Sequence, residues 1–353
     1  MFPEEFVAKQ LLAYSSRGDT VFDPFCGRGT TVFESLLRGR PGAGTDINPV
    51  AACVAGAKSD PPMLRSVIAR LDHLRRRFES EGWSAPQPDT FFAACFHSRT
   101  LPQLLFLRQE LKWRTSRVDQ FIAAVLLGCL HGESHKSPNY LSNRMPRTIS
   151  TKPDYSVRWW AARGCQAPER DAFSVVQQMS EFRLSEAALP IRGSVKLRDA
   201  RSAGRAFPSL EGKVKLMVTS PPYLDTTDYR EDQWLRLWFL GGPDRPTRLQ
   251  ASDDRHRNNA KYWSFLTDAW KGCAPLLNAK SVLVVRIGGA KLTKKDLFGG
   301  LTNSLDSALG GFRILPVHDG ITTEIRNRQT NAFRPGTQSQ RFEHDFAFEL
   351  SRK

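Results

Sequence analysis

Groups that could hold a planar base with an amino substituent occur together in Thr219-Ser220-Pro221-Pro222-Tyr223. The mostly apolar run 214–218 before them predicts a buried strand, and the prolines end it because proline donates no hydrogen bond to a β-ladder. We expect the loop to present a hydroxyl (Ser220), a fixed backbone carbonyl (Pro221) and an aromatic face (Tyr223) where parallel strands of α/β folds bind ligands. For this pentapeptide alone, a proline-capped turn with a core tyrosine is the alternative.

A glycine-rich turn follows another predicted strand, 20–22, and reads Asp23-Pro24-Phe25-Cys26-Gly27-Arg28-Gly29-Thr30-Thr31. Its two glycines let the backbone turn tightly against a ligand before a helix predicted over 30–38. About twenty residues further on, Asp46 ends a predicted strand 41–46, in the position from which dinucleotide folds bind ribose hydroxyls. A glycine-rich turn is a weak signal by itself and gains weight from its occurrence together with the Ser-Pro-Pro-Tyr loop.

Together the two motifs resemble the amino-methyltransferases of DNA, which transfer a methyl group to an exocyclic base nitrogen. The resemblance covers 2–48 and extends from Val195 to the C-terminus. It implies S-adenosyl-L-methionine as the cofactor and catalytic roles for Ser220, Pro221, Pro222 and Tyr223. The cofactor-binding residues that it implies are Pro3, Phe6, Asp23, Pro24, Phe25, Cys26, Gly27, Gly29, Thr30, Thr31, Asp46, Ile47, Asn48, Asp199 and Ala200.

Structural alternatives stay open for some of these residues. Pro3 and Phe6 belong to an amphipathic terminal helix ending near residue 14, and its packing explains them as well as a place at the methionine end of the cofactor does. Asp199 ends a short predicted strand, 195–201, where the family binds the adenine amino group, and a helix-capping aspartate is nearly as good an explanation. Cys26 is expected to be a small filler, since the proposed chemistry needs no thiolate.

The predicted fold class is α/β, a doubly wound Rossmann-like methyltransferase sheet that is mostly parallel, with an antiparallel closing strand. Further strands are expected at 281–287, 312–317 and 345–350. A largely helical, basic insert interrupts the sheet, with helices predicted over 66–79, 101–113 and 118–130. We therefore expect 1–60 and 191–353 to form the catalytic domain and 61–190 to form the insert, a target-recognition region.

The insert also carries an excess of positive charge, with twelve Lys or Arg against five Asp or Glu over 99–170. Interleaved aromatic side chains at Tyr140, Tyr155, Trp159 and Trp160 fit stacking beside phosphate contacts. A second basic loop, 326–341, contains no acid. The predicted DNA-binding residues are Lys136, Tyr140, Arg144, Arg147, Lys152, Arg158, Arg326, Arg328 and Arg334. A solvated basic loop folded over a helical subdomain is the alternative.

Residue types exclude two neighbouring chemistries and favour one target atom. Methylation at ring carbon five needs a cysteine nucleophile, which that family carries in a Pro-Cys dipeptide that this sequence lacks. Nuclease or glycosylase work needs clustered carboxylates or metal ligands, and no metal site is predicted. Serine after threonine resembles the cytosine-N4 enzymes, whereas adenine-N6 relatives usually have Asp or Asn in place of Ser220. We favour cytosine N4 in a base flipped out of duplex DNA, with adenine N6 as the alternative.

Length and composition agree with a nucleic-acid enzyme. The chain has 353 residues and a net charge of +15, which favours a polyanion such as nucleic acid over anionic lipid. No apolar run is long enough to span a bilayer and the N-terminus lacks the features of a signal peptide, so we expect a cytoplasmic protein active in the prokaryotic nucleoid. The six cysteines form no Cys-x-x-Cys pair, so neither a zinc site nor a disulfide framework is predicted.

The predicted partner is double-stranded DNA, with no membrane and no metal. The cofactor turn precedes the catalytic loop, which is the order of a permuted relative, so the resemblance does not transfer oligomeric state or recognition residues. A homodimer and a cognate restriction endonuclease acting on the same site stay open. So do two other functions: an RNA base methyltransferase, since basic charge does not distinguish duplex DNA from structured RNA, and a non-catalytic DNA-binding protein on the same scaffold.

Overall fold

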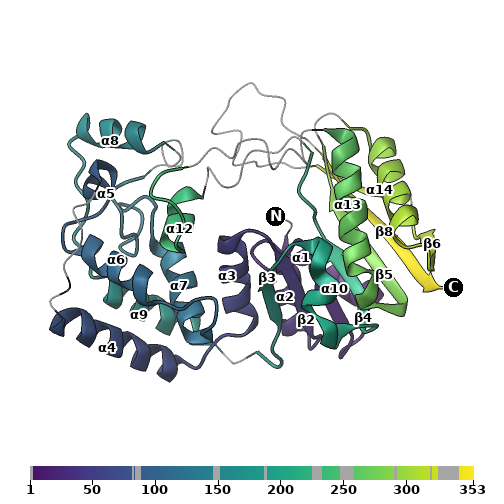
Figure 1. Cartoon of the computed structure of the whole chain (residues 1–353), viewed down its shortest axis with the longest axis horizontal. Coiled ribbons are helices and arrows are strands. Elements are labelled where there is room, and N and C mark those ends of the chain that lie inside the picture. Colours follow the sequence, from purple (N-terminus) through teal and green to yellow (C-terminus); the bar gives the residue numbers. More distant parts are fainter. Residues whose placement is uncertain are drawn as a thin grey trace. The chain divides into compact units, whose positions relative to one another are not determined.

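The computed structural model describes residues 3–81, 83, 89–145, 152–186, 189–224, 233–246, 258–289, 292–318, 320–324 and 342–353. Contacts divide the chain into two compact units. The first consists of 1–60, 189–227 and 249–353, and the second of 61–188 and 228–248. Figure 1 shows the chain, with labels on helices and strands of both units.

The first unit contains a sheet whose strands lie in the order β3-β2-β1-β4-β5-β8-β6, and β7 also pairs with β8. Strands β3, β2, β1, β4 and β5 are parallel, whereas β8 is antiparallel to β5, β6 and β7. The bounds are β1 Thr20–Asp23, β2 Gly42–Asp46, β3 Ser194–Leu197, β4 Val214–Thr219, β5 Leu277–Ile287, β6 Phe312–Pro316, β7 Ile321–Glu324 and β8 Phe342–Arg352. The predicted mostly parallel sheet with antiparallel closing strands is confirmed.

The order of the strands reverses at β1, the first strand of the chain. Strands β2 and β3 lie on one side of β1, and β4 and β5 lie on the other. Doubly wound folds bind ligands at the carboxyl ends of the strands that flank such a switch point. The glycine turn leaves β1 and the Ser-Pro-Pro-Tyr loop leaves β4, so both motifs lie at this point of the sheet.

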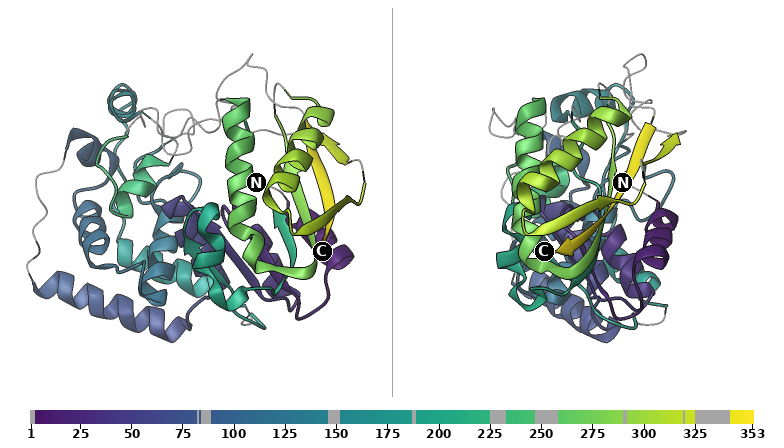
Figure 2. Two further views of the ribbon diagram at one scale, coloured as in Figure 1. Left: turned by 45° about the vertical axis from the view of Figure 1, so that its right-hand side comes forward. Right: turned by 90° about the vertical axis from the view of Figure 1, so that its right-hand side faces the viewer.

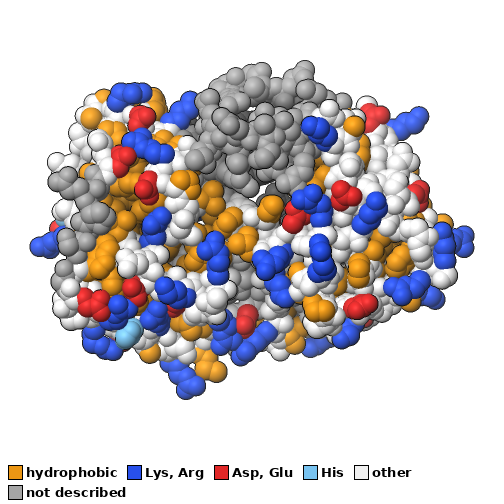
Figure 3. Space-filling view, in the orientation of Figure 1, with side chains coloured by type: hydrophobic (Ala, Val, Ile, Leu, Met, Phe, Trp, Pro, Cys, Tyr) orange, Lys and Arg blue, Asp and Glu red, His pale blue; other side chains and the backbone are white. Residues whose placement is uncertain are grey.

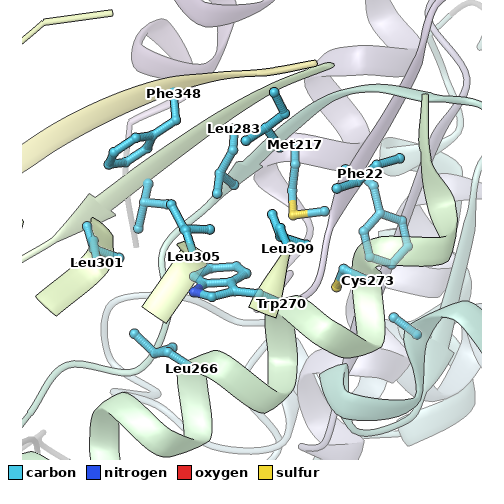
Figure 4. Packing of buried hydrophobic residues seen from close by; sticks show 14 of the residues in the cluster. Phe22, Met217, Leu266, Trp270, Cys273, Leu283, Leu301, Leu305, Leu309 and Phe348 are labelled. Atoms are coloured by element: carbon cyan, nitrogen blue, oxygen red, sulfur yellow. The ribbon is translucent and has the colours of Figure 1, made fainter. Parts of the chain in front are cut away.

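Side chains of the strands alternate between two cores, as the pleat of a β-strand requires. Val21 and Leu216 pack with α1 (Glu4–Tyr14). Their neighbours Phe22 and Met217 face α13 (Asn259–Cys273) and α14 (Lys294–Ala308), and Figure 4 shows them in this core with Trp270 of α13. In the right-hand view of Figure 2 the strands lie between the green helices α13 and α14 and the purple N-terminal helices.

Local capping signals explain where the remaining helices of the first unit begin. Helix α2 (Thr30–Leu37) follows the glycine turn, and α3 (Pro49–Ser59) begins where the Asn48 side chain accepts a hydrogen bond from the Val50 amide at 2.9 Å. Thr293 and Asp296 form a reciprocal capping box at the start of α14. The short elements are α10 (Ala203–Ala206) and the 3-10 helices η1 (Ala200–Ser202), η2 (Pro208–Leu210) and η4 (Ala274–Leu276).

The described part of the second unit is helical, as predicted for the insert. Its helices are α4 (Leu64–Ser80), α5 (Thr90–Cys95), α6 (Thr100–Glu110), α7 (Arg117–Cys129), α8 (Pro153–Ala161), α9 (Ala172–Arg183) and α12 (Trp234–Phe239). The Arg70 guanidinium of α4 pairs with the buried Asp119 carboxylate of α7 at 2.9 Å. Among the residues that the structure describes, no helix combines the length and apolar character needed to cross a membrane.

Segment 228–248 groups with this second unit, whereas the sequence predicted 191–353 to be one part of the catalytic domain. The Trp234 ring lies 5.0 Å from Phe91, and the Trp238 ring lies 4.5 Å from Phe92. Arg108 donates to the carbonyl of Trp238 at 2.8 Å. The predicted boundary is wrong here because the tryptophan-rich helix α12 buries its apolar side chains against the insert.

Candidate active site

The buried carboxylate of Asp23 joins the ends of β1 and β4. Asp23 is 1% exposed, and its Oδ1 accepts hydrogen bonds from the Thr219 hydroxyl at 2.6 Å and the Phe25 amide at 3.1 Å. Burial raises the pKa of Asp23 from 3.8 to about 6, against the lowering effect of these hydrogen bonds. The first residue of the glycine turn is therefore in direct contact with the residue before Ser220.

Both glycines of the turn have a positive φ, and one of them also lacks room for a Cβ. Gly27 and Gly29 have φ angles of 52° and 81°, a region that other residues rarely adopt. A Cβ on Gly29 would lie 2.8 Å from the Cβ of Ala55 on α3, whereas a Cβ on Gly27 would meet no described atom within 4 Å. The turn thus packs closely on α3 at Gly29 and leaves open space at Gly27, where a ligand can approach the backbone.

Asp46 holds the turn from the end of β2. Its Oδ2 accepts a hydrogen bond from the Gly27 amide and its Oδ1 from the Asn48 amide, both at 2.8 Å. Burial raises the pKa of Asp46, against the lowering effect of the two amides. The neighbouring Ile47 is 50% exposed, so a carboxylate and an apolar side chain lie together at the end of β2.

Other predicted cofactor residues have side chains that shape the turn itself. The buried Thr31 hydroxyl donates to a β4 carbonyl at 3.2 Å. The Pro24 carbonyl accepts a hydrogen bond from the Thr45 hydroxyl at 2.8 Å, and the Phe25 ring packs on α13. Burial raises the pKa of the Cys26 thiol, which fits its predicted role as a small filler.

Both ends of the Ser-Pro-Pro-Tyr loop are fixed to the sheet. Thr219 ends β4, and Leu224 forms a parallel bridge with Gly289, just beyond β5. Pro221 is buried, and Ser220 and Tyr223 are half-buried. The loop is therefore held at both ends, with two prolines restricting the backbone between them.

Tyr223 connects the loop to strand β8, near the C-terminal end of the sequence. Its hydroxyl donates to Glu343 on β8 at 2.8 Å, and the Ser220 hydroxyl donates to the Tyr223 oxygen over a longer 3.3 Å. Burial, with the charge on Glu343, raises the pKa of Tyr223 well above its ordinary value. The phenol is thus a neutral donor whose ring is held at the hydroxyl end.

The structure places Asp199 as the cap of a short helix, which was the alternative to its predicted cofactor contact. Strand β3 ends at Leu197, so the predicted strand 195–201 is too long, and a 3-10 helix begins at Ala200. The Asp199 Oδ1 accepts hydrogen bonds from the Arg201 amide at 2.9 Å and the Arg201 Nε at 3.0 Å. Ala200 is 4% exposed. The strand ends early because this carboxylate binds the backbone two residues ahead.

The two residues predicted from the N-terminal helix differ in exposure. Pro3 is exposed and stands immediately before α1. Phe6 is 8% exposed and packs with the core of the sheet. The guanidinium carbon of Arg286 lies 3.8 Å from the centre of the Phe6 ring, so packing explains this side chain.

The structure separates the predicted DNA-binding residues into accessible and packed side chains. Arg144, Lys152 and Arg158 are exposed. Lys136 is also exposed but pairs with Glu133 at 2.9 Å. Figure 3 shows Lys and Arg side chains spread over the visible face, with acidic side chains scattered among them. The positions Arg147, Arg326, Arg328 and Arg334 lie outside the described residues.

Two aromatic side chains of the insert differ in exposure. Trp160 is buried, so its predicted stacking on bases is wrong, whereas the half-buried Tyr140 stays a predicted contact. The Tyr140 ring lies against Gly132, where an added Cβ would come within 2.5 Å of it. Trp160 is 1% exposed, and its Nε1 donates to the Arg144 carbonyl at 2.5 Å. Trp159 lies under the guanidinium of Arg163 at 4.4 Å, a basic neighbour that sequence reasoning missed.

Sequence reasoning also missed the charged residues that lie next to the Ser-Pro-Pro-Tyr loop. Arg286, near the end of β5, pairs with Asp345 on β8 at 2.6 Å, and Glu343 lies two residues before Asp345. The run Glu343-His344-Asp345 beside a strongly apolar strand could have indicated them, because charged side chains buried in a sheet need partners. In the described residues no group of three or more His, Cys, Asp or Glu side chains is arranged to hold a metal ion.

Comparison with known proteins supports the resemblance over the cofactor part of the site. A family model of DNA methylases (N6/N4 methyltransferases) matches residues 1–55, which contain the glycine turn and Asp46. The orphan methyltransferase M.BamHII of Bacillus amyloliquefaciens is 34% identical over 87 residues, which are 25% of this chain and 29% of that protein. The predicted resemblance and the use of S-adenosyl-L-methionine agree with both matches.

Solved structures give more distant likenesses. The rRNA methyltransferase aviRa from Streptomyces viridochromogenes has 12% identity and a TM-score of 0.36, over 99% of this chain and 85% of that one. An rRNA methylase from Streptococcus thermophilus has 9% identity and a TM-score of 0.34, over 100% and 97% of the two chains. With TM-scores below 0.5, these likenesses do not bear on the substrate.

Proposed function

We propose that this chain transfers a methyl group from S-adenosyl-L-methionine to the exocyclic N4 of a cytosine that is flipped out of duplex DNA. The observation that carries the proposal is the 2.6 Å hydrogen bond between Thr219 and Asp23. It joins the loop suited to hold an amino base to the turn suited to hold the cofactor. Methyl transfer requires this proximity because donor and acceptor must react in line.

The residues at the switch point fit the cofactor. Open space at Gly27 lets a ligand approach the turn. The Asp46 carboxylate still has acceptor capacity beyond its two amide hydrogen bonds, which suits ribose hydroxyls. The exposed Ile47 offers an apolar surface to the adenine ring. When bound, S-adenosyl-L-methionine supplies a methyl group that its sulfonium charge has already activated.

The task of the protein is then to activate the amine. An exocyclic amine is a weak nucleophile because its lone pair is delocalised into the ring. The Ser220 oxygen and the Pro221 carbonyl would accept hydrogen bonds from the amino group and localise that lone pair, while the Tyr223 ring stacks on the base. In the transfer a carbon–nitrogen bond would form as the sulfur–carbon bond breaks, with the electron pair of that bond staying on sulfur and one amine proton passing to solvent.

The choice of cytosine over adenine depends on Ser220, since adenine-N6 relatives usually carry Asp or Asn there. Duplex DNA is favoured by the match to DNA methylases, and the net charge of +15 suits a nucleic acid of either kind. We assign target recognition to the second unit, with contacts from its exposed Arg144, Lys152 and Arg158. A homodimer and a cognate restriction endonuclease stay predictions.

Nucleoside mass spectrometry tests the proposal. The purified chain is incubated with S-adenosyl-L-methionine and either mixed-sequence duplex DNA or structured RNA, and the methylated nucleosides are identified. N4-methylcytosine in the DNA is expected. N6-methyladenine alone contradicts the cytosine assignment, and methylated bases in the RNA alone contradict the DNA assignment. Cofactor binding without methylation of either nucleic acid supports the non-catalytic alternative.

A further inference from the structure

The hydroxyl of the catalytic tyrosine is bound by a carboxylate that lies 120 residues away in the sequence. Glu343 reaches it from β8, which runs antiparallel to β5 and pairs Ile287 with His344. The bridge between Leu224 and Gly289 holds the catalytic loop at the same end of β5. Closure of the sheet by β8 therefore brings Glu343 to the loop, with its side chain 15% exposed.

The donors and acceptors in this contact fix its direction. A tyrosine hydroxyl has one proton, and a carboxylate only accepts. Because Tyr223 donates to Glu343 at 2.8 Å, its oxygen can only accept from the Ser220 hydroxyl, 3.3 Å away. The Ser220 proton is thereby directed toward Tyr223. The Ser220 lone pairs are left to accept hydrogen bonds from a substrate amine.

Glu343 is itself held in place by neighbouring charges. Arg286 forms two hydrogen bonds with Asp345, at 2.6 and 2.7 Å, and its Nη1 lies 3.8 Å from the Glu343 Oε2. The Arg286 guanidinium also covers the Phe6 ring of α1. A mobile surface glutamate would not hold a tyrosine in one orientation, whereas this one is partly buried beside a fixed cation.

We propose that Glu343 is a positioning residue for methyl transfer, which aims the acceptor lone pairs of Ser220 through the Tyr223 hydroxyl. The inference rests on the proposed function, because it needs an amine substrate at Ser220. Glu343 does not touch the substrate in this account. Its loss lets the Tyr223 hydroxyl turn and donate to Ser220, which occupies a lone pair that the amine needs.

Three variants separate this role from simple packing. Glu343→Leu removes the acceptor, and Glu343→Gln keeps an acceptor oxygen but can also present a donor. Tyr223→Phe removes the hydroxyl and keeps the ring. Glu349→Leu is the matched control, since it removes an exposed glutamate from the same strand.

We expect Glu343→Leu to lower kcat by about tenfold or more, with little change in cofactor affinity or in KM for DNA. Glu343→Gln should recover part of the loss, and Glu349→Leu should keep the wild-type kcat. In the Tyr223→Phe background, Glu343→Leu should cost little further activity, because both changes break the same hydrogen-bond chain.

A wild-type kcat in folded Glu343→Leu overturns the inference. So does a double variant, Tyr223→Phe with Glu343→Leu, whose loss of kcat equals the product of the two single losses. Folding is checked by urea unfolding of each variant. A wild type that methylates no amino group overturns the proposed function and the inference with it. A wild type that is active beside an equally active Glu343→Leu overturns the inference alone, so the two failures are distinguishable.

Discussion

Replacement of Asp23 with asparagine should remove a pH-dependent loss of stability. Burial is the main cause that raises the pKa of this carboxyl from 3.8 to about 6. The folded state thus holds the proton more tightly than the unfolded state, so the free energy of unfolding falls as the pH rises from about 4 to about 6. At about 1.4 kcal/mol for each pKa unit, the full loss is about 3 kcal/mol, and it is absent below about pH 4.

Urea unfolding of wild type and Asp23→Asn, at about pH 4.5 and about pH 7.5, measures this effect. The difference between the unfolding free energies of the two proteins excludes the titrations that both share. Between the two pH values this difference should change by about 2 of the 3 kcal/mol. Asparagine keeps an acceptor for Thr219 and Phe25, so the variant should become more stable relative to wild type at the higher pH. Asp306→Asn, at an exposed position of α14, is the control. An Asp23→Asn difference that is equal at both pH values would refute the reasoning.

Three further predictions concern the turn and the second unit. Asp46→Ala should weaken cofactor binding by about tenfold to a hundredfold in calorimetric titration, since hydrogen bonds to a charged group are lost. Gly29→Ala should lower the free energy of unfolding by about 2 kcal/mol or more, because the positive φ and the 2.8 Å approach to Ala55 both oppose a Cβ. Arg144→Ala with Arg158→Ala should flatten the salt dependence of DNA binding by about two charge equivalents, as measured by fluorescence anisotropy.

Two control variants and two contrary results test these predictions. Gly212 has a positive φ, but an added Cβ there meets no described atom within 4 Å. Gly212→Ala should therefore lower the free energy of unfolding less than Gly29→Ala does. Lys213→Ala removes an exposed cation from the first unit and should leave the salt slope unchanged. Unchanged cofactor affinity in Asp46→Ala removes that residue from the site. An unaltered salt slope in the double arginine variant would place DNA elsewhere.

The parts of the site that the sequence could predict are those encoded by local rules. A β-branched strand followed by prolines defines a strand end, and two glycines before a helix define a tight turn. Because parallel strands present their carboxyl ends to the same edge of a sheet, the sequence alone places Asp23, Asp46 and Ser220 near the switch point.

The parts that sequence reasoning missed depend on pairings between distant segments. Glu343 reaches Tyr223 only because β8 enters the sheet beside β5 in one register, which local patterns do not specify. Trp234 joins the second unit through Phe91, more than a hundred residues earlier. Trp160 was predicted to stack on bases because aromatic side chains are interleaved with basic ones there, whereas the helix α8 turns Trp160 inward.

The most direct test of the account is the single-turnover rate of methyl transfer by Ser220→Ala, measured with saturating cofactor and DNA. The variant loses one acceptor for the reacting amine and leaves the glycine turn unchanged. We expect the rate to fall by about a hundredfold or more while cofactor affinity changes by less than about twofold. Ser307→Ala, an exposed serine on α14, should react at the wild-type rate. A wild-type rate in Ser220→Ala would contradict the proposal that this loop activates the amine.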